Sequence, residues 1–95
     1  MHYVYVLFCK DGQFYTGHTS NLRERLRQHK NGEVFATRYR LPVQLVFYEA
    51  LLHQMDAERR ERYLKTTAGK RALKLMLREY LSINDRCLSA EDNAG

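Results

Sequence analysis

Tyr3-Val4-Tyr5-Val6-Leu7-Phe8-Cys9 is an unbroken run of residues that favour β-strands. A run without polar alternation is typical of a strand covered on both faces, so we expect it at the centre of a sheet. Asp11-Gly12 follows as a hairpin turn signal, and Phe14-Tyr15-Thr16-Gly17 is predicted to return antiparallel to the first strand.

The residues after this hairpin predict a first helix, a loop and a third strand. Asn21 can cap a helix while Glu24 reaches back to it, and Asn31-Gly32 is expected to end that helix. Residues 33–41 show no clear period and are interpreted as a loop that Pro42 closes. The apolar and aromatic residues of 43–49 predict a third strand.

Two further helices complete the prediction. Asp56 can cap a second helix that runs to about Thr66, and Thr67-Ala68-Gly69 is expected to break it. A third helix follows, whose apolar residues recur at helical spacing and are predicted to be core. These residues are Leu73, Met76, Leu77, Tyr80 and Leu81.

The element order β-β-α-β-α-α predicts an α/β protein of the α+β kind, with a small three-stranded antiparallel sheet flanked by helices. A chain of 95 residues fits a single domain, which we place at residues 1–82. Residues 83–95 lose the apolar pattern and are expected to form a flexible C-terminal tail.

The charge of the chain is unevenly distributed. Residues 1–82 contain 15 Lys and Arg against 8 Asp and Glu, a net charge of +7, whereas residues 83–95 carry −2. A basic folded body favours a polyanionic partner such as nucleic acid, although a basic surface also serves solubility alone. No segment is apolar enough to span a membrane and no signal peptide is evident, which predicts a cytoplasmic protein.

The first predicted helix carries two residues of chemical interest. Arg25 and His29 lie four residues apart, on the same side as Leu22 and Leu26, at the margin of the buried stripe. Arg25 is either a functional guanidinium or an ordinary solvated side chain. His29 is either a functional imidazole or a hydrogen-bonded histidine at the edge of the core.

The second predicted helix places the carboxylate of Glu61 within its apolar stripe, a costly position without a partner. Glu61 is either a metal ligand or the partner of Lys65 in a structural ion pair. Tyr5 and Tyr15 lie on two strands that should pair, and each is either a site residue or a half-buried core ring.

Four segments taken in order resemble the GIY-YIG nuclease domain, and the match spans about residues 2–81. They are Tyr3-Val4-Tyr5, Tyr15-Thr16-Gly17, Asn21-Leu22-Arg23-Glu24-Arg25 and Ala57-Glu58-Arg59-Arg60-Glu61. The chain is most similar to the short, free-standing bacterial members of that family. It departs from the pattern at Tyr3, where the family name has glycine, and at Thr16, where it has isoleucine.

The resemblance implies a role for each matching residue. Tyr5 and Tyr15 match the tyrosines of the two motifs, Arg25 the arginine that contacts phosphate, and His29 a supporting histidine. Glu61 matches the single carboxylate that binds the metal ion. His18 falls where relatives often carry a basic residue, which makes it a weaker candidate for contacting nucleic acid.

A shared site for both tyrosines requires a particular hairpin. A two-residue turn would place Tyr15 opposite Phe8 and turn Tyr5 to the other side of the sheet. A connection with an odd number of residues, for example Lys10-Asp11-Gly12 with Gly12 left-handed in a bulge, places both phenols on one side of the sheet. We predict such an odd-numbered connection.

The function implied is a DNA endonuclease of repair or processing that hydrolyses phosphodiester bonds with one Mg²⁺ or Mn²⁺. Glu61 would hold the ion, Tyr15 would activate water and Tyr5 would position it. Structured or damaged duplex DNA is the expected partner, RNA stays open, and the protein is expected as a monomer or weak homodimer. The alternative is a nucleic-acid-binding module that has kept the fold and lost catalysis.

Five basic residues are candidates for contacts to the nucleic-acid backbone, which add affinity without sequence specificity. The alternative is a solvated basic face. They are Arg38, Arg40, Lys70, Arg71 and Lys74.

Overall fold

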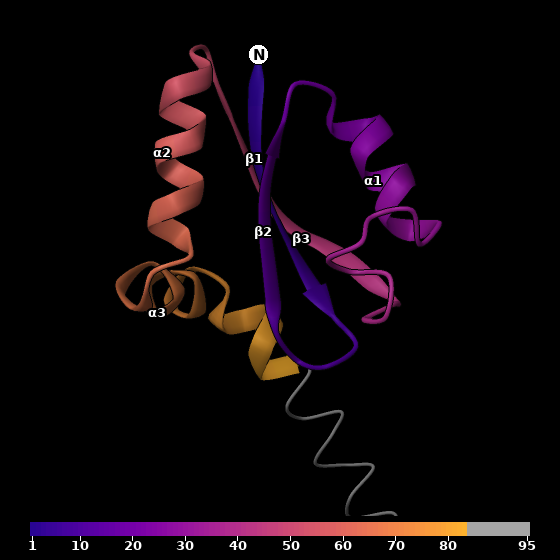
Figure 1. The fold of residues 1–95 in the computed structure, drawn as a ribbon. Helices are drawn as coiled ribbons and strands as arrows, with labels where there is room; N and C mark the ends of the chain where they lie inside the picture. Colours follow the sequence, from indigo (N-terminus) through magenta and orange to yellow (C-terminus); the bar gives the residue numbers. More distant parts are fainter. Residues whose placement is uncertain (84–95) are drawn as a thin grey trace, which may run out of the picture.

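The computed structural model describes residues 1–83, and it has the predicted element order and a three-stranded antiparallel sheet. Helix α1 lies against one face of the sheet, and α2 and α3 lie against the other (Figure 1). The fold class predicted from the sequence is thus confirmed. The strands are β1 (His2–Cys9), β2 (Phe14–Thr19) and β3 (Val43–Leu51), and the helices are α1 (Leu22–Lys30), α2 (Gln54–Leu64) and α3 (Thr67–Met76).

Strand β1 is the central strand, as its unbroken apolar run predicts, and the strand order is β2-β1-β3. Residues Val4–Leu7 are fully buried, because helices cover both faces of the sheet. Alternate side chains of β1 therefore serve two different layers. Val4 and Val6 point towards α2 and α3, whereas Tyr5 reaches His29 of α1.

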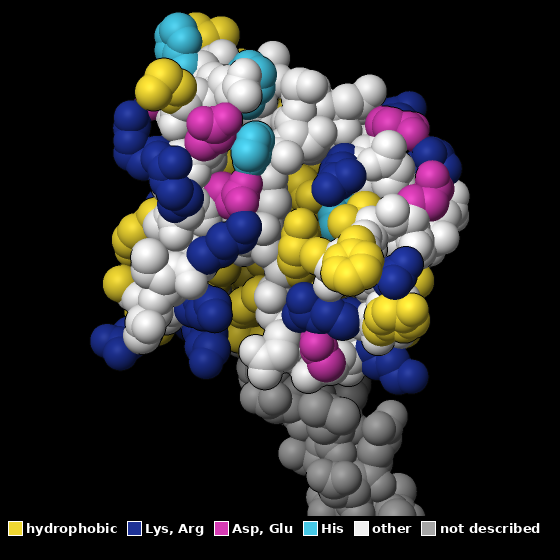
Figure 2. Space-filling view, viewed as in Figure 1, with side chains coloured by type: hydrophobic (Ala, Val, Ile, Leu, Met, Phe, Trp, Pro, Cys, Tyr) yellow, Lys and Arg dark blue, Asp and Glu magenta, His cyan; other side chains and the backbone are white. Residues whose placement is uncertain are grey.

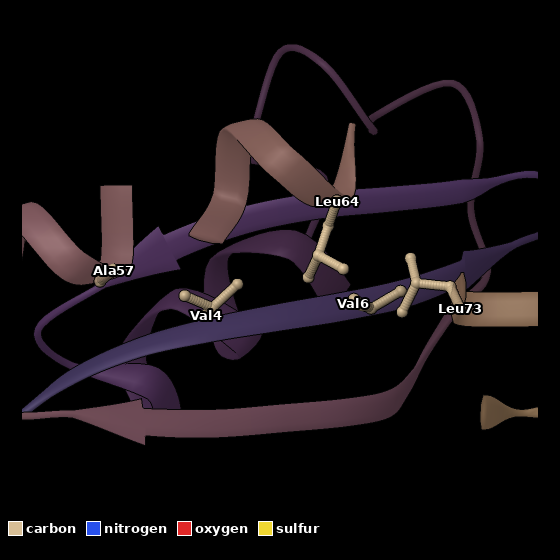
Figure 3. Packing of buried hydrophobic residues seen from close by; sticks show 5 residues of the cluster. All are labelled: Val4, Val6, Ala57, Leu64 and Leu73. Atoms are coloured by element: carbon tan, nitrogen blue, oxygen red, sulfur yellow. The ribbon is translucent and has the colours of Figure 1, made fainter. Parts of the chain in front are cut away.

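The main core lies between β1 and the helices α2 and α3 (Figure 3). Val4 and Val6 project from the strand towards Ala57 and Leu64 of α2 and towards Leu73 of α3. Burying one such valine or leucine side chain contributes about 1.5–3 kcal/mol, so these five residues supply much of the stability. This core also fixes α2 against the sheet.

The β1–β2 hairpin has the odd connection predicted from the sequence. Phe8 pairs with Phe14, and the N–H of Cys9 donates to the carbonyl of Gln13 at 3.0 Å, which leaves three residues, 10–12, in the loop. Gly12 adopts a positive φ of 78°, the left-handed conformation that such a bulge requires. Tyr15 consequently pairs with Leu7, on the Tyr5 side of the sheet.

Helix α1 begins as predicted, with the side chain of Asn21 accepting a hydrogen bond from the N–H of Glu24 at 3.1 Å. The second half of the expected capping box is absent. The Glu24 carboxylate instead pairs with Arg27 at 2.7 Å, three residues along the helix. Gly32, with φ of 74°, follows the last turn where the sequence places the end of the helix.

The start of α2 differs from the prediction. The helix begins at Gln54, after an extended His53 whose side chain makes no capping hydrogen bond. Asp56, the expected cap, lies inside the first turn and pairs with Arg59 at 2.9 Å. A carboxylate is also favourable there because it faces the positive end of the helix dipole.

The expected break at residues 67–69 is wrong, because these residues form the first turn of α3. Thr66 caps this helix by accepting a hydrogen bond from the N–H of Gly69 at 3.1 Å. A Cβ at Gly69 would collide with the carbonyl oxygen of Tyr63. Glycine is therefore needed for a close approach of α3 to the end of α2.

The apolar stripe of the third helix is only partly core. Leu73 is fully buried and Leu77 half-buried, but Met76 is 46% exposed. Helix α3 ends at Met76, and residues 78–83 form a separate helical segment in which Tyr80 packs its ring on Phe8. Met76 is exposed because it lies about 60° around the helix from Leu73.

The expected tail, residues 83–95, falls outside the described residues except for Ile83, which is still helical. Among the helices of residues 1–83, none has the length and apolar character needed to cross a membrane.

Candidate active site

Two tyrosines form the centre of the candidate site, on the side of the sheet that faces α1. The rings of Tyr5 and Tyr15 have centroids 6.4 Å apart. Tyr5 is only 1% exposed, whereas Tyr15 at the edge strand is half-buried. The two phenols share one side because the hairpin connection is odd, as the register argument requires.

His29 connects helix α1 to this pair. Its Nε2 lies 2.8 Å from the Tyr5 hydroxyl, and its ring lies edge-on to Tyr15 with centroids 5.2 Å apart. Burial, aided by the positive charge of Arg25, lowers the pKa of His29 from 6.5 to about 4. The imidazole is therefore neutral near pH 7, with one nitrogen donating and the other accepting.

Thr37 is a site residue that the sequence reasoning missed. Its hydroxyl lies 2.8 Å from Nδ1 of His29, and its side chain is fully buried. A loop has no hydrophobic period, so no pattern in residues 33–41 distinguished this threonine from its neighbours. Tyr5, His29 and Thr37 thus form a buried hydrogen-bonded chain from the sheet through α1 to the following loop.

Arg25 lies beside both phenols. The adjacent Tyr5 hydroxyl raises the pKa of Arg25, and Tyr15 adds to the effect. Its Nη1 donates to Oε1 of Gln28 at 3.0 Å, which holds the guanidinium on this side of the helix. Burial raises the pKa of Tyr5 above 10.0 in spite of this neighbouring charge, so the Tyr5 phenol stays protonated at neutral pH.

Glu61 of α2 lies across the edge strand from this group. Its carboxylate contacts Nδ1 of His18 and accepts a hydrogen bond from Nζ of Lys65 at 2.5 Å. Although burial raises its pKa, Lys65 and His18 bring it below the ordinary value, so Glu61 is ionised. The ion pair with Lys65, one of the two alternatives, is present in the structure, and the other alternative, a metal ligand, would use the same carboxylate oxygens.

The edge strand β2 separates two groups of candidate site residues. His18 points to the α2 side with Glu61, whereas Tyr15 points to the α1 side with Tyr5. Glu61 is still near enough for its charge to act on Tyr5. In Figure 2 histidine and acidic side chains gather beside basic ones on the α2 side of this face, and the α1 side shows basic, acidic and hydrophobic side chains together. Residues 1–83 contain no cluster of three or more His, Cys, Asp or Glu residues suited to a metal ion.

The three basic candidates of α3 lie near the hairpin end of this face. Lys70 lines a recess of about 280 Å³ together with Tyr15 and Lys65. Lys70 and Lys74 also line a neighbouring recess of about 170 Å³ beside Gly12. Arg71 is exposed on the same helix.

The two basic candidates of the α1–β3 loop are engaged differently. Arg40 pairs with Asp11 of the hairpin, Nε to Oδ2 at 2.7 Å, so it fastens the loop to the sheet. Arg38 is exposed and lies over two aromatic rings of its own loop. Among the described residues Arg38, unlike Arg40, therefore has no carboxylate partner.

Comparison with known proteins agrees with this arrangement. The family model described as the GIY-YIG catalytic domain matches residues 1–74. The chain belongs to the GIY-YIG family. That family consists in general of nucleases, which act on nucleic acid and typically use divalent metal ions.

Relatives of this GIY-YIG chain include the UPF0213 protein of Clostridium perfringens, which is 43% identical over 77 residues covering 80% of this chain and 83% of the relative. A UPF0213 protein of Staphylococcus saprophyticus is 40% identical over 76 residues, 79% and 93% of the two chains. The solution NMR structure of a UPF0213 protein from Bacillus halodurans is similar with a TM-score of 0.52 and 37% identity, covering 79% of this chain and 83% of that one. The GIY-YIG fold is therefore shared with a solved relative.

Proposed function

We propose that this GIY-YIG protein is an endonuclease that hydrolyses phosphodiester bonds in DNA with one divalent metal ion, in repair or processing. The observation that carries the proposal is the grouping of Tyr5, Tyr15 and Arg25 around a neutral, buried His29, with ionised Glu61 across the edge strand. Phosphodiester hydrolysis needs positive charge at the phosphate and a group that takes a proton from water, and this grouping provides both.

Arg25 would bind the scissile phosphate. Its planar guanidinium can donate two parallel hydrogen bonds to nonbridging oxygens, a geometry that lysine does not reproduce. Gln28 orients the guanidinium through the 3.0 Å hydrogen bond to Nη1. A bound phosphate would then lie beside the hydroxyls of both tyrosines.

Tyr15 would take the proton from the attacking water. It is half-buried on the edge strand, whereas Tyr5 is buried and keeps its proton because burial raises its pKa. Positive charge beside a phenol stabilises the phenolate, which is the form that accepts a proton from water. Arg25 supplies part of this charge from within the protein.

Tyr5 would position Tyr15 and the water. His29 contacts Thr37 through Nδ1 and Tyr5 through Nε2. In the tautomer that carries its proton on Nδ1, Nδ1–H would donate to Thr37 and Nε2 would accept the proton of the Tyr5 hydroxyl, which would leave the lone pairs of the Tyr5 oxygen for the site.

Glu61 would hold the metal ion. A single ionised carboxylate at the edge of the site fits Mg²⁺ or Mn²⁺, which keep most of their water and take few protein ligands. Since His18 and Lys65 contact this carboxylate, the ion would compete with them for its oxygens. When bound, the ion would stabilise the charge that develops on the phosphate oxygens.

The test is a cleavage assay on nicked, branched and plain duplex DNA with Mg²⁺ or Mn²⁺, and with matched RNA. We expect cutting by the wild type, none by Glu61→Ala, and wild-type cutting by Glu79→Ala, which removes an exposed carboxylate outside the site. Arg25→Lys should also impair turnover. Nucleic-acid binding that survives Glu61→Ala, with no cutting by either protein on any substrate, would instead establish the binding module.

A further inference from the structure

The loop between α1 and β3 holds two aromatic side chains in solvent. Phe35 is 79% exposed and Tyr39 is 85% exposed, the highest values among the large hydrophobic residues of the described chain. The guanidinium carbon of Arg38 lies 4.6 Å from the ring centroid of Phe35 and 4.8 Å from that of Tyr39. We call these three residues the loop stack.

The loop that carries the stack is anchored. Val34 and Thr37 are buried, and the N–H groups of Thr37 and Arg38 both donate to the carbonyl of Val34, at 3.2 and 3.0 Å. Arg40 is bound to Asp11, and its carbonyl accepts a hydrogen bond from the N–H of Lys10 at 3.0 Å. The exposed rings are thus presented by a fixed backbone.

We propose that the loop stack binds an unpaired nucleobase of the nucleic acid whose phosphate lies in the neighbouring catalytic site, an inference that rests on the proposed function. Aromatic rings stack on any base because every base has a π face, and a guanidinium adds a cation–π contribution and attracts phosphate. Within residues 1–83, Arg38 has no carboxylate partner, so its charge is available to a polyanion.

The stack is tied to the catalytic group through Thr37. Phe35 and Tyr39 each lie two residues from Thr37, no more than about 7 Å along the chain. Thr37 contacts His29 directly, and His29 contacts Tyr5. A base on the stack would therefore be held next to the site where its strand is cut, which would favour substrates with unpaired nucleotides near the scissile bond.

The size and chemistry of the stack favour a base over a protein partner. Stable protein interfaces bury about 800 Å² on each side, far more than three side chains provide. The positive charge of Arg38 beside the two rings also suits a polyanion, since it can attract phosphate while the rings contact a base. Binding of the loop stack to a second copy of the chain is the competing possibility, and the test below would detect it as a dimer.

The test is fluorescence anisotropy with chelator present, so that no DNA is cut. Two duplexes are compared that differ only in a short unpaired stretch containing 2-aminopurine. We expect the wild type to bind the unpaired substrate more tightly and to quench 2-aminopurine. The double variant Phe35→Ala/Tyr39→Ala should lose about 5-fold or more of affinity for that substrate and lose the quenching, with little change for plain duplex.

Two controls separate stacking from other effects. Leu52→Ala/Met55→Ala removes two similarly exposed hydrophobic side chains at the β3–α2 turn and should behave as wild type. Arg38→Lys keeps the charge but loses the planar stack, so it should keep affinity for plain duplex and lose part of the preference for unpaired bases.

Three results would overturn the proposal. The first is equal binding of both duplexes by the wild type, the second is an unpaired-base preference that the double variant keeps, and the third is a wild-type dimer that the double variant dissociates in light scattering. If one of these results is found and Glu61→Ala still abolishes cleavage, the base-binding role of the loop stack is rejected and the proposed nuclease function stands. If quenching depends on the loop stack but the wild type cuts no substrate, the proposed nuclease function is rejected and the base-binding role stands.

Discussion

Gly17 lies directly opposite Tyr5 in the sheet, and a Cβ at position 17 would come within 2.5 Å of the Tyr5 hydroxyl oxygen. Because Gly17 has no side chain, the Tyr5 phenol can occupy this space. Because Tyr5 is buried and its hydroxyl contacts His29, moving the ring away from position 17 would disturb this contact and the packing around it.

Gly17→Ala should displace the Tyr5 hydroxyl and lower cleavage on the order of 100-fold, the effect expected of a displacement near 1 Å in a catalytic group. The overpacked contact should also cost about 1–3 kcal/mol of unfolding free energy. Turnover is measured at a temperature where thermal melts show the variant fully folded. Wild-type turnover in a folded Gly17→Ala protein would show that the position of Tyr5 is unimportant.

Thr37→Val should keep the volume of the buried side chain and remove the hydrogen bond to Nδ1 of His29. Leaving the buried Nδ1 of His29 without a hydrogen-bond partner costs about 1–3 kcal/mol, so we expect that loss in urea unfolding. We also expect a lower kcat with KM little changed, and a shift in the tautomer signals of His29 in nitrogen-15 NMR. Thr37→Ser, which keeps the hydroxyl, should restore kcat; failure of that rescue would limit Thr37 to packing.

The protein should lose stability as the pH falls below about 6.5 because of His29. Its pKa is about 4 in the folded protein and 6.5 ordinarily, so the unfolded chain binds more protons between these values. Folding stability from this residue is complete above the ordinary pKa and declines by up to roughly 3 kcal/mol as the pH approaches 4. Urea unfolding at about pH 7 and about pH 5 measures the change.

The matched controls are His29→Phe, which removes this titration, and His53→Gln, which changes an exposed histidine. The pH dependence in this window should weaken in the first and stay in the second. An equal dependence in wild type and His29→Phe would assign it to other groups.

Lys70→Gln/Lys74→Gln should weaken binding to all DNA sequences alike, because both lysines line recesses beside the hairpin and are expected to contact phosphate. The slope of log affinity against log salt should fall by about 2, one unit for each lost contact. The control variant Arg23→Gln/Lys30→Gln removes the same amount of charge from a different recess, which lies between α1 and β3. It should leave the slope nearly unchanged. Identical slopes for both double variants would indicate a general charge effect.

Local patterns predicted the elements whose formation depends on nearby residues. The apolar run of 3–9 identified the central strand because helices cover both of its faces, and Asn21 identified the start of α1 because it caps that helix. The requirement that Tyr5 and Tyr15 share a side predicted the hairpin length, since side chains in a strand alternate strictly.

The features that the sequence did not predict depend on contacts between residues far apart in the chain or between neighbouring elements. The segment 67–69 looks like a helix break by propensity, but Thr66 caps a helix there and Gly69 packs against the end of α2. Glu61 meets His18 across 43 positions of sequence, and Thr37 meets His29 from a loop without period. No local signal marks such pairs, so the sequence predicted neither of them, and the other candidate site residues were named through the family resemblance.

The three-residue connection at Lys10-Asp11-Gly12 makes the site sensitive to changes in the length of this hairpin. If the same tight turn re-forms after one codon is inserted or deleted, the register shifts by one and every β2 side chain turns over, which moves Tyr15 to the α2 side and His18 away from Glu61. Both residues stay in place only when a longer loop takes up the extra residues and the strand pairing is unchanged. Natural variants of this hairpin should therefore differ in the size of the loop and keep the pairing of Leu7 with Tyr15.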